Sequence, residues 1–385
     1  MKKYLFGAMV VGVAFTSCVN DVEADLLAES KAKPISFEVA KYKASSRAEG
    51  GVQGLADPGH TEYATNQFFG AFAFYAETTN GEHAPFENED GVKMENAKVG
   101  YVNDVWTALG DTYFWPQEGH IDFVSYSPYN TNATIAVGHV NDGAKDYNAL
   151  SITDYTVGDD DLMYSDKAHL QTHNKTLHYK SGVPTMFRHA LAKLNFKVQT
   201  KHVQTTEVVG EQSKVIYWRV VVNSVKLNKI FNKGSLTLHT TSPQVAGTTQ
   251  YEIANLAADA PKVWTRANSQ IDKEWTSAGG QVLTTTATNF GDAINYYVLP
   301  QTFTVGEQSF TVNYTVENKV GETGTWSTPT EFTKTIGFTE RAVMVSAWEM
   351  GKNITYTILI DPKGDVITFD PAVADWEEIN GTLDI

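Results

Sequence analysis

The amino-acid sequence predicts an all-β protein, and three observations carry this prediction. Apolar and polar residues alternate over whole runs, most clearly at 310–316 and 354–358, as expected of strands with one buried face. Aromatic residues, Thr and Val, which favour pleated strands, recur throughout the chain. The runs are short and separated by clusters of Gly, Asn, Asp and Pro, and no run of comparable length has helical periodicity apart from one candidate turn at 140–147. We therefore expect antiparallel β-sandwiches.

The order of the elements suggests two domains. Two loop-rich regions, at 44–51 and 158–182, interrupt the alternating pattern, and a strand-like run restarts at Pro184. A length of 385 residues also favours two domains. We expect an N-terminal domain at residues 48–182 and a C-terminal domain at residues 183–385. In chain order, the alternating runs predict strands at 35–39, 121–123, 194–198, 310–316 and 354–358.

The N-terminus has the composition of an export signal. Two lysines precede an apolar stretch from Tyr4 to Phe15, and Thr16-Ser17 leads to Cys18, the only cysteine. This stretch is shorter than the roughly 20 residues that span a membrane. It resembles a bacterial lipobox, although Phe15 stands where Leu is usual. We predict a signal peptide at residues 1–17 and lipidation of Cys18, which places the protein at the cell outer membrane.

Composition narrows the range of partners. The chain carries 45 acidic and 30 basic side chains and has no basic cluster that would neutralise a phosphate backbone, so no nucleic-acid partner is expected. With Cys18 acylated, no thiol is left for a disulfide. The acidic stretch at 19–25 is either a solvated tether or similar to the tag that directs Bacteroidetes lipoproteins to the outer face of the outer membrane.

Candidate chemical sites are few. The histidines 169, 173 and 178 fall in a polar loop region, and Asp159–Asp161 lacks the spaced ligands and the glycine of an EF-hand, so both sets fit solvated loops better than metal sites. The sequence has no Gly-x-Ser-x-Gly elbow and no phosphate-cradling glycine loop. We expect no metal, no cofactor and no enzymatic activity. The three histidines of this region are His169, His173 and His178.

One arginine stands apart from the other four. Arg47 lies in a run of small, flexible residues, where an extended backbone can enter a protease cleft. It is either an exposed loop residue without a role or a processing site. Cleavage after Arg47 would detach the strand at 35–39 and leave an unpaired strand edge, which is a template for another strand.

Motifs along nearly the whole chain resemble those of the Bacteroidales fimbrillin family, the subunits of type V pili. The resemblance is carried by the lipobox at Cys18, the strand Ile35–Val39, the junction Ser46-Arg47-Ala48, the aromatic runs Phe68–Phe74 and Tyr113–Pro116, the segments Ile121–Pro128, Phe187–Leu194 and Leu299-Pro300-Gln301, and the closing Trp376.

This resemblance implies a specific route of assembly. Fimbrillins have two transthyretin-like β-sandwich domains in tandem and are exported as lipoproteins, held in the outer membrane by the lipid before cleavage. A trypsin-like, Arg-specific protease then cuts after an arginine, here between Arg47 and Ala48, so residues 18–47 would be a lipidated propeptide. The removed strand carries Ile35, Phe37 and Val39. A C-terminal strand of the next subunit fills the vacated groove, and the candidate anchors in this chain are Val373, Trp376, Ile379 and Leu383.

Two functions follow from these expectations. The first is a structural subunit of a cell-surface fimbria, in the stalk because Arg47 is present, with other fimbrial subunits, including anchor and tip subunits, as partners. The alternative is a tip adhesin or a non-polymerising surface lipoprotein that binds glycan or a host protein. Trp264, Trp275 and Trp326 would either stack on sugars or be partly buried in the sandwich.

Overall fold

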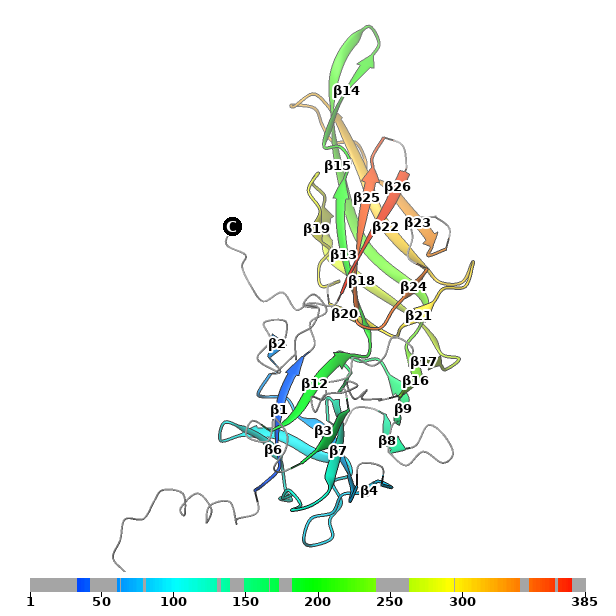
Figure 1. Ribbon diagram of the computed structural model, residues 1–385. Helices are drawn as coiled ribbons and strands as arrows, with labels where there is room; N and C mark the ends of the chain where they lie inside the picture. The colour runs from blue at the N-terminus through cyan, green and yellow to red at the C-terminus, as the bar shows by residue number, and fades with distance from the viewer. Residues whose placement is uncertain are drawn as a thin grey trace, which may run out of the picture.

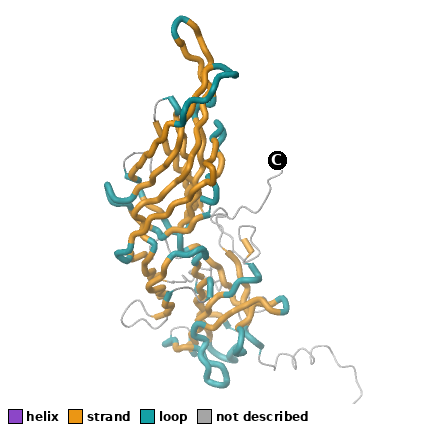
Figure 2. The backbone as a smooth tube through the Cα atoms, turned by 180° about the vertical axis from the view of Figure 1, so that it is seen from behind, coloured by secondary structure: helices purple, strands orange, loops and turns teal. Residues whose placement is uncertain are grey.

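The computed structural model shows an elongated molecule in which two regions are stacked end to end (Figures 1 and 2). All regular elements within the described residues are strands, which confirms the predicted all-β class. The finer prediction of two tandem transthyretin-like sandwiches stays a prediction. The structure describes residues 33–41, 61–62, 64–78, 81–129, 133–138, 149–165, 167–172, 182–239, 263–293, 295–339, 346–363 and 366–375.

The first region, here called the barrel region, is built from two sheets. Its strands are β1 (Ser36–Lys41), β2 (Thr61–Glu62), β3 (Phe69–Ala76), β4 (Ala84–Pro85), β5 (Ala97–Val102), β6 (Val105–Ala108), β7 (His120–Ser127), β8 (Thr134–Gly138), β9 (Ala149–Thr156), β10 (Met163–Ser165), β11 (Ala168–Gln171), β12 (Val183–His189), β16 (Lys233–His239) and β17 (Val263–Arg266).

The larger sheet of the barrel region closes on itself. It has ten strands in the order β11-β7-β10-β12-β1-β6-β5-β3-β4, with β2 paired to β1. Because β3 also pairs with β7, the strands β1, β6, β5, β3, β7, β10 and β12 form a closed ring. The second sheet has four strands in the order β17-β16-β9-β8 and packs on the outside of this ring.

Alternation along the strands separates two cores in the barrel region. On β3, Phe69 and Ala71 point into the ring, while Phe72 and Phe74 point outward toward the four-stranded sheet. Both faces of β7 are covered in the same way, so all of its residues are buried. Two neighbouring cores therefore share one wall of strands.

The second region, here called the sandwich region, is a pair of facing sheets with a small two-stranded sheet, β21-β24. One sheet has the order β19-β13-β25-β26 with β20 on β13, and the other has the order β14-β15-β22-β23 with β18 on β15. The strands are β13 (Ala192–Thr200), β14 (Gln204–Val209), β15 (Gln212–Phe231), β18 (Gln270–Val282), β19 (Thr288–Asn289), β20 (Tyr296–Val298), β21 (Gln301–Thr302), β22 (Ser309–Val320), β23 (Thr330–Gly337), β24 (Ala347–Trp348), β25 (Lys352–Asp361) and β26 (Val366–Asp375).

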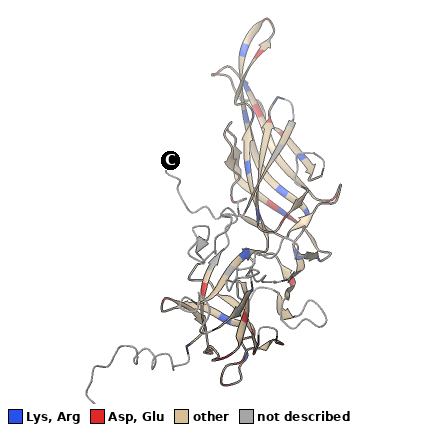
Figure 3. Ribbon diagram, viewed as in Figure 1, with Lys and Arg blue, Asp and Glu red and all other residues tan. Residues whose placement is uncertain are grey.

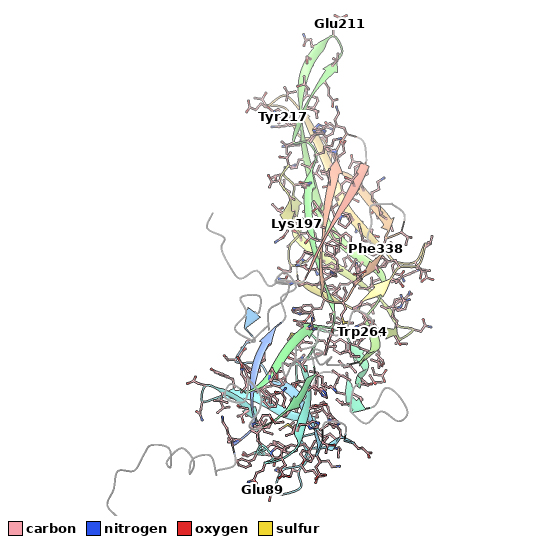
Figure 4. All side chains as sticks on the ribbon, viewed as in Figure 1. Glu89, Lys197, Glu211, Tyr217, Trp264 and Phe338 are labelled. Carbon is pink, nitrogen blue, oxygen red and sulfur yellow. The ribbon has the colours of Figure 1, made fainter. Side chains whose placement is uncertain are left out.

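Aromatic side chains fill the space between the two facing sheets. Phe196 stacks on Tyr356 with ring centroids 5.7 Å apart, and Phe310 meets both rings from the opposite sheet at 6.3 and 5.6 Å. Beyond this core, β14 and the start of β15 form a hairpin that projects from the far end of the molecule, with Glu211 at its tip (Figure 4). Along the long strands of this region, basic and acidic residues are interspersed (Figure 3).

The chain passes between the two regions three times, from β12 to β13, from β15 to β16 and from β17 to β18. Strand pairings therefore cross the predicted boundary between residues 182 and 183, because β12 and β16 follow it in sequence but pair with β1 and β9. Hydrogen bonding places β12, β16 and β17 with the N-terminal strands. The division at residue 182 as a folding boundary stays a prediction.

The strand predictions are confirmed, and one loop prediction is wrong. The runs at 35–39, 121–123, 194–198, 310–316 and 354–358 fall within or overlap β1, β7, β13, β22 and β25. The predicted loop region at 158–182 contains β10 and β11, which pair with β7. These strands are so short that alternation cannot be recognised in them.

Candidate functional site

The strand β1 completes the ring of the barrel region. It pairs in parallel with β12, where Phe37 faces Val183 and Val39 faces Thr185. On its other side it pairs antiparallel with β6, where Phe37 faces Trp106. The strand therefore lies between two partners and not at an edge, so removing it would open the ring and leave β12 and β6 each with one unpaired edge.

Apolar side chains of β1, and Ile35 just before it, belong to the core inside the ring. Ile35 and Phe37 are buried, and half-buried Val39 packs against the same core. The Phe37 ring meets Phe69 and Phe123 edge-on at centroid distances of 5.5 and 5.8 Å. Edge-to-face pairs add to the free energy gained by burial alone, so Phe37 is the main anchor of the strand.

The segment just before β1 is also fixed by backbone hydrogen bonds. The Ile35 amide donates to the Tyr113 carbonyl at 2.7 Å, and the Trp115 amide donates to the Lys33 carbonyl at 3.0 Å. Gly182, with φ of +115°, lies where β1 passes the start of β12, and a Cβ there would come within 2.7 Å of the Phe37 carbonyl carbon. The groove that holds β1 is thus shaped for a close backbone approach.

The C-terminal strand β26, unlike β1, lies at the edge of its sheet. It pairs antiparallel with β25 along its whole length and forms the edge of its sheet among the described strands. Ile367 is buried, whereas Val373, opposite Ile354, is 49% exposed. Of the predicted donor anchors, only Val373 is described, and the structure places it on a strand already paired within its own subunit.

Several predicted site residues lie outside the described residues. They are Cys18, Arg47, Ala48, Trp376, Ile379, Leu383, His173 and His178. The structure does place the last residue of β1, Lys41, and the first of β2, Thr61, and the predicted cleavage junction falls on the chain that connects them.

Two predicted solvated loops are in fact partly buried and paired, which corrects the sequence-based interpretation. His169 Nδ1 lies 2.8 Å from both carboxylate oxygens of Asp122. Asp161 Oδ2 lies 2.8 Å from His189 Nδ1, whereas Asp159 and its neighbour at 160 are exposed as predicted. Among the described residues, no group of three or more His, Cys, Asp or Glu side chains has the arrangement to hold a metal ion.

A buried polar cluster surrounds Asp122 and was not found from the sequence. Asp122 lies on the outer face of β7 and contacts Lys167 and His83 besides His169. His120, two residues earlier, is buried next to His83, and this burial lowers the pKa of His120 to about 4. The one signal in the sequence is the Asp between Ile121 and Phe123, and it reads as an ordinary solvent-facing position.

The three tryptophans considered for sugar stacking are all engaged within the chain. Trp264, at the level where the two regions meet (Figure 4), donates its indole N–H to the Ala190 carbonyl at 2.9 Å. Trp275 packs against Phe196 in the sandwich core. Trp326 covers the outer face of a sheet, with the Arg219 guanidinium 4.6 Å from its ring centre. All three tryptophans are therefore partly buried.

Comparisons with known proteins show what this chain is similar to. A family model described as fimbrillin-like matches residues 57–376. The solved structure of a fimbrial protein from Bacteroides vulgatus is similar over 89% of this chain and 99% of its own, with 18% identity and a TM-score of 0.51. A protein from Bacteroides uniformis, provisionally assigned to cell adhesion, aligns over 89% of this chain and 99% of its own, with 16% identity and a TM-score of 0.38. No curated protein matches the chain.

The described part of the chain holds no helix with the length and apolarity needed to cross a membrane. The match to the fimbrillin-like model spans well over half of the 385 residues, and at 18% identity the Bacteroides vulgatus structure supports the fold. The chain belongs to the fimbrillin-like family.

Proposed function

We propose that this chain is a stalk subunit of a cell-surface fimbria, exported to the cell outer membrane as a lipoprotein, cut after Arg47 and polymerised by strand exchange between subunits. Membership of the fimbrillin-like family and the fimbrial identity of a structural neighbour support a fimbrial subunit at the cell surface. Lipidation at Cys18, cleavage and strand exchange are the finer parts of the proposal.

The position of β1 is the observation that best supports the proposed strand exchange. The strand β1, with buried Phe37 and with buried Ile35 just before it, closes a ring that the rest of the chain leaves incomplete. The chain after it runs through Arg47 before it rejoins the sheet at β2. A single cut there makes β1 a separate peptide, held only by non-covalent contacts.

The proposed donor is the end of the tail and not β26. Detaching β26 would break its pairing with β25, which runs from Val366 to Asp375. From Ile379 onward, odd-numbered positions are Ile, Gly, Leu and Ile, which repeats the spacing of Ile35, Phe37 and Val39 on β1. Such a segment offers the same face to a strand-shaped groove.

N-terminal sequencing of the fimbriae released from cells tests the proposal. We expect chains that begin at Ala48. The Arg47→Lys variant keeps the charge but removes the arginine, so it should remain uncut by an Arg-specific protease and stay out of the fibre. Wild-type chains that begin only at Cys18 would overturn the stalk assignment.

A tip adhesin is the second candidate, and partly buried Trp326, between Arg219 and Lys319 at the surface, is the feature that favours it. A tip subunit needs no donor strand. Deleting residues 379–385 should therefore abolish incorporation of a stalk subunit but leave a tip subunit in place, and electron microscopy with an antibody to this chain distinguishes the two.

A further inference from the structure

A lysine and an aspartate are buried together on the outer face of the ring of the barrel region. Asp122, on β7, has a side chain that is 0% exposed, and the side chain of Lys167, just before β11, is 2% exposed. The Lys167 Nζ atom lies 3.2 Å from Asp122 Oδ2. The segment that carries β10 and β11 runs antiparallel beside β7, so the two residues are held together by the sheet itself.

Imidazole groups surround the carboxylate of this pair. His169 Nδ1 is 2.8 Å from both of its oxygens, and His83 Nε2 is 3.3 Å from Oδ2. The ring of His120 lies 5.3 Å from that of His83 and completes the cluster. The rings of His169 and His83 contact the Asp122 carboxylate. An imidazole can both accept and donate a proton near neutral pH.

The cluster is not arranged as a cation site. The Lys167 ammonium already stands against Asp122 Oδ2. Within the described ranges, no set of three or more His, Cys, Asp or Glu side chains has a metal-binding arrangement. The cation that faces the carboxylate belongs to the chain.

We propose that Lys167 and Asp122 join in an intramolecular isopeptide bond. The Lys167 Nζ atom attacks Asp122 Cγ, an N–C bond forms, and one C–O bond of the carboxylate breaks. Two protons of the ammonium leave with that oxygen as one water molecule, and His169 and His83 carry them between nitrogen and oxygen. No electrons are transferred and no co-reactant is needed.

Burial favours this condensation for a physical reason. In water, the ammonium and the carboxylate are stabilised by hydration, which opposes amide formation. A buried ion pair has lost most of that hydration, and the attraction between its charges only partly compensates. The amide carries no net charge, and the released water can enter bulk solvent, so the equilibrium moves toward the bond.

The bond would close the chain between residues 122 and 167 into a loop that contains β8, β9 and β10. Of these strands, β8 and β9 belong to the four-stranded sheet outside the ring. A covalent bond between the two ends of this loop would hold the four-stranded sheet to the ring under mechanical load. It would also restrict the conformations of the unfolded chain. This consequence holds whether or not the chain forms a fibre.

Trypsin digestion of the purified full chain, followed by mass spectrometry, tests the proposal. Trypsin cuts after lysine, so an unlinked chain gives three separate peptides, 99–145, 146–167 and 168–175. The bond blocks cleavage at Lys167. We therefore expect one species that joins 99–145 to 146–175, lacks the mass of one water relative to the two peptides, and shows two N-terminal residues, Val99 and Asp146.

Two variants serve as controls. Lys167→Met removes the amine and should release 99–145 and 146–175 as separate peptides. Lys193→Met removes another buried lysine and should leave the linked species intact. Recovery of free 146–167 and 168–175 from the folded wild-type chain, with residue 122 unmodified, would overturn the proposal without any variant having to fold.

Discussion

The barrel and sandwich regions depend on their terminal strands in opposite ways. In the barrel region, β1 lies between β12 and β6 and places Phe37, 2% exposed, in the centre of the core. In the sandwich region, β26 is the outermost strand of its sheet among the described strands, and its Val373 is 49% exposed. We therefore expect the stability of the barrel region to depend strongly on one strand and that of the sandwich region to be spread over many contacts.

This difference would have a functional meaning if the chain exchanges strands between subunits as proposed above. A groove can be filled by a donor only if one strand carries much of the binding energy and can leave without breaking the rest. The closed sandwich core, with Phe196, Phe310 and Tyr356 in contact across both sheets, needs no such strand. We therefore expect the sandwich region to remain folded during the proposed strand exchange in the barrel region.

The largest expected effect comes from truncating the anchor of β1. Phe37→Ala should lower the free energy of unfolding of the barrel region by about 3–5 kcal/mol, because it removes a buried aromatic side chain and leaves a cavity among Phe69 and Phe123. Hydrogen exchange should show faster opening of β12 and β6 with little change in β13 and β25.

The matched control for that variant is Val373→Ala on β26. It should cost less than about 1 kcal/mol, because a half-exposed side chain loses little burial. Equal effects of the two substitutions would contradict the contrast between the two regions.

The buried faces of the strands in both regions could be predicted from the sequence, but the pairing of β1 with β12 could not. Alternation at 310–316 correctly assigned Phe310, Val312 and Tyr314 to one buried face of β22. Alternation also gave the inward face of β1, but it cannot name a partner, and β12 lies far along the chain. Pairing between such distant segments depends on the whole fold.

The buried cluster around Asp122 was missed for a related reason. Between Ile121 and Phe123, a polar residue is expected to face solvent, as it does on a strand with one buried face. The second sheet and the segments near β7 cover the other face as well, so every residue of β7 is buried. A sequence pattern shows the periodicity of one strand and not what packs on its second face.

The next largest effect is a pH dependence of the free energy of unfolding, which we expect in the barrel region and not in the sandwich region. Burial lowers the pKa of His120 to about 4, below the value of about 6.5 for an unfolded chain. The folded state thus binds fewer protons than the unfolded state between these values, so stability is full above pH 6.5 and falls as pH drops toward 4. The loss should approach about 3 kcal/mol.

The measurement is chemical unfolding between pH 7 and pH 4, followed by hydrogen exchange in each region. The barrel region should lose protection first. His120→Leu should flatten this pH dependence, and His202→Gln, in the sandwich region, should leave it unchanged. A pH dependence that survives in the His120 variant would show that another group is responsible.

The smallest expected effect tests whether stability in the sandwich region is spread over many modest contacts. On the outer face, Arg219 donates two hydrogen bonds to Glu317, at 2.5 and 2.6 Å, and stacks on Trp326. The Arg219 side chain is more than one-third exposed, so solvent screens the pair. A double-mutant cycle of Arg219→Met and Glu317→Gln should give a coupling energy of about 1 kcal/mol.

The same cycle at Lys226 and Asp272, a more exposed pair 2.8 Å apart, should give a smaller coupling than the Arg219–Glu317 pair. Its Asp has half of its side chain in solvent and, unlike Glu317, sits opposite a single ammonium and not a planar guanidinium. A coupling above about 3 kcal/mol at the Arg219–Glu317 pair would mean that the sandwich region, like the barrel region, depends on one dominant contact. The distinction between an exchangeable and a permanent half of the molecule would then have to rest on the position of β1 alone.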